Sequence, residues 1–106
     1  MHGNDEQAFV IMEQPVRDAI ARITLPRFST KRFIEELRAT TEGEAAYQEA
    51  IGAMASSGEN MAMMVLHGQV IPGLLRRSGQ VQFGGFIHGN SAEDDGFGVP
   101  SMWLKR

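Results

Sequence analysis

Apolar residues near the start of the chain recur at intervals of three and four, the spacing of one face of an α-helix. The positions in this stripe are Phe9, Met12, Val16, Ala19, Ile20 and Ile23. Pro15 interrupts the stripe. Because proline suits the first turn of a helix and disrupts its interior, the pattern predicts a helix over about residues 14–24. The residues before Pro15 are expected to form a separate turn or a short helix bent against it.

Two further helices are predicted after an extended connection at Leu25, which precedes a proline and is therefore disfavoured in a helix. Ser29 or Thr30 can cap the first of them, and its apolar face is Phe33, Ile34 and Leu37. Thr41 and Glu44 have the spacing of a capping box and predict the start of the second. Its apolar positions are Tyr47, Ala50, Ile51 and Met54.

A fourth helical pattern begins near Glu59, and its apolar positions are Met61, Met64, Val65, Ile71, Leu74 and Leu75. Gly68 and Pro72 weaken its middle, so a kinked helix or two short ones are expected, the second starting with Pro72 in its first turn. Gly79 stands where a glycine would end it. The methionines of "NMAMMVL" are expected in the core because of their helical spacing, with an adaptable binding surface as the alternative.

The apolar period changes to two in the last third of the chain, which predicts strands. In "QVQFGGFIH", Val81, Phe83 and Ile87 alternate with Gln82 and Phe86. In "VPSMWLK", the side chain of Trp103 is expected on the face opposite to Met102 and Leu104, where it anchors the strand to the rest of the domain. A polar loop joins the two strands. The predicted fold class is therefore α+β, with a small helical core followed by a C-terminal β-hairpin.

Composition narrows the class of protein. The chain has 106 residues, which suits one domain, and 42% of them are apolar. It has no cysteine, so disulfides, thiol catalysis and cysteine-based zinc sites are excluded. The longest apolar run, residues 62–66, is far shorter than the roughly 20 residues of a membrane span. A cytoplasmic location and no membrane partner are expected.

The charges are segregated along the chain, although the net charge is only −3. Residues 14–38 carry six basic and three acidic side chains, whereas residues 39–62 carry four acidic ones and no basic one. Solvated helix faces account for most such runs. The basic segment is nevertheless the part of the chain best suited to a polyanion.

No motif for catalysis, a metal or a cofactor has the required spacing. His2, His67 and His88 match no zinc pattern, and "GNSAEDDGFG" lacks the ligand order of an EF-hand loop. The glycines of "GGFIHG" do not open a helix after a strand, and no "GxSxG" occurs. A carboxylate pair stays open because the sequence selects none. We therefore expect no enzymatic activity, no metal and no cofactor.

The order of elements resembles the winged helix-turn-helix family. "RFS" at residues 27–29 takes the place of the short first strand, "HGQVIPGLLRRSG" that of the DNA-reading helix, and "QVQFGGFIH" and "VPSMWLKR" those of the wing. The resemblance covers residues 14–106, and residues 1–13 form an N-terminal segment expected to act as a dimerisation arm. It implies a DNA-binding regulatory domain that contacts double-stranded DNA through Lys31, Arg32, Gln69, Arg76 and Arg77.

The expected wing tip is acidic, because it carries Glu93, Asp94 and Asp95. Carboxylates repel phosphate, so these residues favour an alternative: a protein–protein interaction module of the same fold. That module would bind its partner through the acidic loop or the methionine-rich helix. A homodimer formed through the N-terminal stripe of Phe9, Met12 and Val16 is expected in either case.

Overall fold

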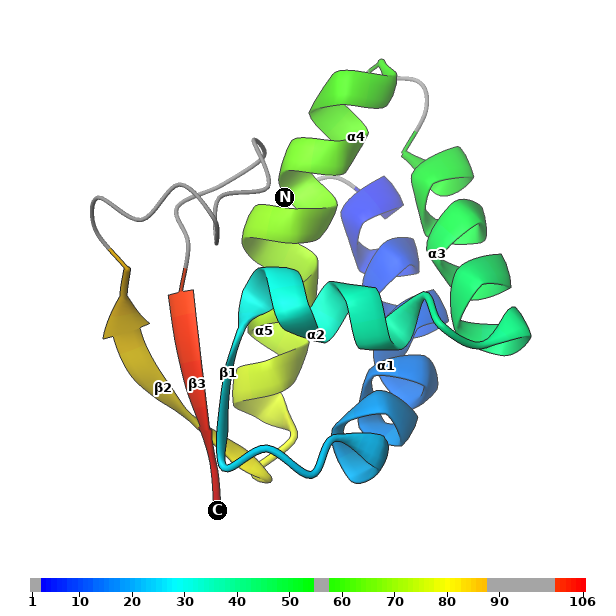
Figure 1. Cartoon of the computed structure of the whole chain (residues 1–106). Helices are drawn as coiled ribbons and strands as arrows, with labels where there is room; N and C mark the ends of the chain where they lie inside the picture. Colours follow the sequence, from blue (N-terminus) through cyan, green and yellow to red (C-terminus); the bar gives the residue numbers. More distant parts are fainter. Residues whose placement is uncertain (1–2, 55–57, 88–100) are drawn as a thin grey trace.

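A computed structural model of the chain describes residues 3–54, 58–87 and 101–106 (Figure 1). In chain order the elements are α1 (Gly3–Arg22), β1 (Arg27–Ser29), α2 (Thr30–Leu37), α3 (Thr41–Ala53), α4 (Glu59–Val65), the π-helix η2 (Leu66–Val70), α5 (Ile71–Arg77), β2 (Val81–Phe86) and β3 (Ser101–Lys105). The predicted α+β class with a C-terminal hairpin is confirmed. In Figure 1 the sheet lies on one side of the segment formed by α4, η2 and α5, and α1 and α3 lie on the other.

Helix α1 runs without a break through Pro15, so the prediction of a helix that begins near Gln14 is wrong. Proline in a helix interior costs about 3 kcal/mol. Burial of one large apolar side chain contributes about 1.5 to 3 kcal/mol, and the stripe buries several, among them Met12, Val16 and Ile20. The expected boundary between residues 13 and 14 falls inside this helix. Met12 and Val16 face the core of their own chain, so they are not available for the predicted dimer contact.

The caps of α2 and α3 define how the chain turns between α1 and the rest of the core. The Oγ of Ser29 accepts a hydrogen bond from the backbone N–H of Arg32 at 3.0 Å. Ser29 is therefore the cap, one of the two candidates predicted with Thr30. Thr40 caps α3 through a 3.0 Å bond from the N–H of Gly43, so the predicted capping box at Thr41 is wrong. The predicted inner faces of both helices are confirmed except for a half-buried Ile51; the buried residues are Phe33, Ile34, Leu37, Tyr47, Ala50 and Met54.

The three strands form an antiparallel sheet in the order β1-β3-β2. Trp103 at its centre is paired with Phe28 on one side and Phe83 on the other, and it is fully buried against the helices. Its Nε1–H donates to the Oγ1 of Thr30 at 2.9 Å, and this oxygen lies 2.5 Å from the Oγ of Ser101. The first residue of α2 is therefore tied to the central strand by buried polar contacts with Trp103 and Ser101.

A bulge in β2 separates Phe83 from Phe86, because the pairing with β3 shifts register between them. Gly85 has φ +103°, a left-handed conformation that suits glycine. The bulge places both phenylalanine rings together, with their centroids 5.1 Å apart. The strict alternation predicted for this strand, which put them on opposite faces, is wrong at this point.

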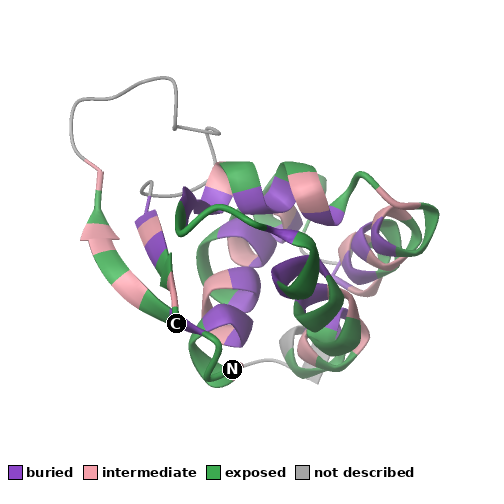
Figure 2. Cartoon of the chain, turned by 60° about the horizontal axis from the view of Figure 1, so that its bottom comes forward, coloured by how far each residue is buried: buried purple, intermediate pink, exposed green. Residues whose placement is uncertain are grey.

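Residues 59–77 form one helical stretch with a π-helical middle, where the N–H of Ile71 bonds to the carbonyl of Leu66, five residues earlier. Pro72 lies in the first turn of α5 and Gly79 follows the helix with φ +71°, as predicted. Figure 2 shows buried positions along the inner sides of the helices and exposed ones on their outer sides. Met61 and Met64 are about half exposed, so the core position predicted for them is wrong. No helix within the described ranges is long and apolar enough to cross a membrane.

Candidate functional site

A hollow of about 430 Å³ lies between the α4–η2–α5 segment and the sheet, and we call it the groove. Its helical wall, within the described residues, consists of Met61, Met64, Val65, His67, Gly68, Gln69, Pro72 and Arg76. Its sheet wall consists of Phe83, Phe86, Ser101 and Trp103. A volume of this size falls within the range of sites that bind small molecules or the side chains of a partner.

The walls of the groove expose large apolar side chains to solvent. Met61, Met64 and Phe86 are 49%, 51% and 54% exposed. Methionine side chains are flexible and polarisable, so they adapt to differently shaped apolar surfaces. The bulge in β2 is what aims Phe86 at the helical wall together with Phe83. Three exposed apolar side chains that converge on one hollow form a patch of the kind that marks interaction sites.

Arg76 contributes the only charged side chain to the groove walls among the described residues. Its guanidinium carbon lies 5.1 Å from the ring centroid of Phe83 and 5.7 Å from that of Trp103. Both distances allow cation–π attraction, which is stronger where the cation is partly shielded from water. The two rings thus hold a positive charge at one defined place in a groove lined mostly by apolar side chains.

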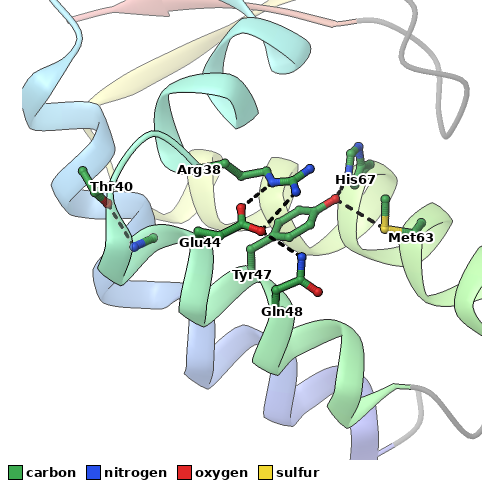
Figure 3. A network of polar contacts seen from close by, with 8 residues as sticks. Arg38, Thr40, Glu44, Tyr47, Gln48, Met63 and His67 are labelled. Carbon is green, nitrogen blue, oxygen red and sulfur yellow. Dashed lines mark hydrogen bonds and ion pairs between the residues drawn. The ribbon is translucent and has the colours of Figure 1, made fainter.

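The π-helix η2, which forms part of the helical wall, is anchored to α3 by a buried polar contact (Figure 3). The Nε2 of His67 lies 2.6 Å from the hydroxyl of Tyr47, which also contacts the sulfur of Met63 at 3.3 Å. Both His67 and Tyr47 are buried. π-Helical turns are rare and occur often at functional sites. Here the π-helix η2 places the imidazole of His67 on the wall of the groove, and the hydroxyl of Tyr47 on α3 holds the ring in position.

The same network continues to the surface through Arg38, whose guanidinium carbon lies 4.3 Å above the ring of Tyr47. Arg38 donates two hydrogen bonds to the carboxylate of Glu44, at 2.6 and 3.1 Å, and Gln48 donates a third at 2.8 Å (Figure 3). The bonds from Arg38 and, secondarily, from Gln48 hold the pKa of Glu44 below its usual value. The hydrogen bonds to Glu44 in turn raise the pKa of Arg38.

The Glu44→Gln substitution is expected to change how stability depends on pH. A carboxylate with a depressed pKa contributes its full stabilisation above the unfolded-state value of 4.5, and loses it as the pH falls through the lower folded-state value. Because Glu44 is partly exposed, this contribution is at most about 1 kcal/mol. Urea unfolding at neutral pH and at several values below 4.5 should therefore show a shallower acid loss for the variant. An equal loss in both proteins, or the same effect from Glu49→Gln on this helix, would contradict this role.

The structure distributes the residues predicted to contact DNA over separate surfaces. Gln69 and Arg76 lie in the groove. Arg77 lines a different hollow beside α1, with its guanidinium carbon 4.6 Å from the ring centroid of Phe9. Lys31 and Arg32 line a third hollow near β1. The two arginines are adjacent on α5 and point to different neighbours, so the helix does not present them together.

The residues predicted to bind a protein partner, Glu93, Asp94 and Asp95, lie outside the described residues, as do His2 and His88. Within the described ranges, no three histidine, aspartate or glutamate side chains cluster in a way that would hold a metal ion. The groove itself was not predicted from the sequence. Its signals in the sequence are the methionines of "NMAMMVL", for which an adaptable binding surface was the alternative prediction, and the paired glycines before Phe86.

Comparisons of this chain with protein-family models, with curated proteins and with solved structures yield no significant match. The resemblance to winged helix-turn-helix domains therefore stays a prediction.

Proposed function

We propose that this chain is a protein-interaction domain whose groove binds a segment of a partner protein through that segment's large apolar side chains. One observation carries the proposal: Met61, Met64 and Phe86 are each about half exposed and line the same hollow. Burial of apolar surface contributes a free energy of roughly 25 cal/mol for each Å², and exposed side chains do not gain it. A partner that covers them recovers this free energy.

The make-up of the groove walls supports a chain segment as its occupant. One wall is a helical stretch and the other a sheet with a bulge, and large apolar side chains line both walls. Grooves of this kind bind peptide segments by accepting a few anchoring side chains. Methionine on one wall and aromatic rings on the other suit such anchors, because the rings are rigid and the methionines adapt.

DNA binding is less well supported by the positions of the basic side chains. Affinity for duplex DNA comes mainly from many phosphate contacts on one continuous basic surface. Lys31, Arg32, Arg76 and Arg77 line three different hollows. Gln69 and Arg76 lie in a groove lined mostly by apolar side chains. DNA binding by a winged helix stays a prediction.

The proposal is tested by selecting peptides of about 16 residues from a random displayed library on the immobilised full chain; as helices they would be about 24 Å long. We expect enrichment of peptides with several large apolar residues. The Met61→Gln, Met64→Gln, Phe86→Ser variant should lose this enrichment while keeping its unfolding temperature within a few degrees, because all three side chains are half exposed.

The matched control is Val10→Gln, Leu104→Gln, which removes exposed apolar side chains that do not line the groove. This variant should enrich the same peptides as the wild type. Equal enrichment on the groove variant, or none on the wild type, would refute the proposal. Tight binding of a fluorescent DNA duplex at low salt, weakening steeply as salt is added, would favour the DNA-binding alternative instead.

A further inference from the structure

We infer that the partner segment carries an acidic side chain between its large apolar residues, and that its carboxylate pairs with Arg76 in the groove. This inference rests on the proposed function. It specifies the chemistry of the partner: an apolar segment of another protein with a carboxylate at the position that reaches the guanidinium of Arg76 beside the ring of Phe83.

The first support is the difference between Arg76 and most of the other arginines. Four arginines in the described part of the chain have a carboxylate oxygen within 4.0 Å, and these pairs are Arg17–Glu13, Arg22–Glu36, Arg32–Glu35 and Arg38–Glu44. Arg76 has no such pair with a described residue and contacts aromatic rings instead. Its charge is thus held in place without being neutralised by those residues.

The second support is charge complementarity. Arg76 is the only charged side chain that lines the groove within the described residues, and most of the other lining side chains are apolar, so a partner with large apolar side chains and a negative group complements these walls. A guanidinium presents a planar set of donors that fits a carboxylate with two parallel hydrogen bonds. Stacking against Phe83 and Trp103 restricts the guanidinium before the partner arrives, so less conformational entropy is lost on binding.

The third support is the environment of this charge. An ion pair on an open surface contributes little, because water screens it and because both side chains must be ordered. Arg76 is exposed in the free chain, and a partner whose apolar residues cover Met61, Met64 and Phe86 would exclude water around the pair. Attraction between charges increases as the surrounding dielectric constant falls. The carboxylate should therefore contribute to affinity and also fix the register of the bound segment.

Nucleic acid fits this arrangement less well, because the groove walls formed by the described residues offer one cation, and several phosphates would remain without partners. A duplex held by a single phosphate contact would show a salt dependence with a slope of only about 1. An acidic protein segment uses the apolar walls and the cation together.

The test repeats the selection in parallel on the wild type and on the Arg76→Gln, Arg76→Lys and Arg77→Gln variants. Arg77 is the matched control, since it is the next residue on α5, is also exposed, and lies over the ring of Phe9 outside the groove. We expect aspartate or glutamate among the apolar positions of peptides enriched on the wild type, on Arg77→Gln and, less strongly, on Arg76→Lys. Peptides enriched on Arg76→Gln should be apolar without this acidic preference.

The affinity of one enriched acidic peptide completes the test. Arg76→Gln and the replacement of the peptide's acid by its amide should each weaken binding about tenfold, and the two changes together should cost little more than either alone. Apolar enrichment without an acidic preference, or additive losses, would overturn this inference and leave the proposed function standing. No enrichment on any of the four proteins would overturn both.

Discussion

Replacing Trp103 by alanine is expected to lower the free energy of unfolding by about 3 to 5 kcal/mol, the range for removal of a buried aromatic side chain. Trp103 is 0% exposed and lies at the centre of the sheet, between Phe28 of β1 and Phe83 of β2. The substitution leaves a cavity where the sheet meets α2. It also removes the N–H donor to Thr30 and one of the two rings beside Arg76.

Chemical denaturation measures this loss, and two variants separate its causes. Trp103→Phe keeps an aromatic ring and removes the hydrogen bond to Thr30, so it should cost clearly less than the alanine variant. Leu104→Ala changes the next residue on the same strand, which is 39% exposed, and should cost less than about 1 kcal/mol. A Trp103→Ala loss as small as that of Leu104→Ala would contradict the packing described here.

Replacing Gly43 by alanine is expected to destabilise the protein by about 1 to 3 kcal/mol or more, as overpacking does in tight sites. A Cβ at position 43 would collide with the carbonyl oxygen of Leu37 and lie 2.9 Å from the Oγ1 of Thr40. The colliding atom belongs to the backbone of α2, so it cannot move aside as a flexible side chain would. Relief of the collision would separate α2 from α3 and weaken the cap that Thr40 provides to the N–H of Gly43.

Gly52 on the same helix provides a control with the opposite sign. A Cβ there meets no heavy atom of its surroundings within 4 Å. Alanine has a higher helix propensity than glycine, so Gly52→Ala should stabilise the protein by up to about 1 kcal/mol. Thermal unfolding of both variants is the measurement. A Gly43→Ala variant as stable as the wild type would show that α2 and α3 are not as close as the structure has them.

The fold was largely predictable because most of its elements follow local rules. Helical spacing identified the buried faces that contain Phe33 and Tyr47, and strand alternation identified Trp103 as a core residue. Pro15 shows where this reasoning fails. The preference of proline for a helix start is a local effect. Burial of Met12 and Val16 on either side of Pro15 is a tertiary effect, and its summed free energy is larger.

The site was not predictable to the same degree, because it depends on what covers each helix face. The spacing of Met61 and Met64 fits a buried stripe as well as an exposed one, and only the position of the sheet leaves them open. The bulge at Gly85 reverses the direction expected for Phe86. Arg76 and Arg77 were grouped as one DNA contact, although adjacent helical residues point in directions about 100° apart. The structure places them in two hollows.

The groove is tested most directly by the NMR signals of the methionine methyl groups in the full chain, recorded while an enriched apolar peptide is added. The methyl groups of Met61 and Met64 line the groove, whereas Met12 and Met54 are buried in the core and serve as internal controls. We expect the signals of Met61 and Met64 to shift with peptide concentration and those of Met12 and Met54 to stay in place. Binding of the peptide with no change at Met61 and Met64 would contradict the assignment of the groove as the binding site.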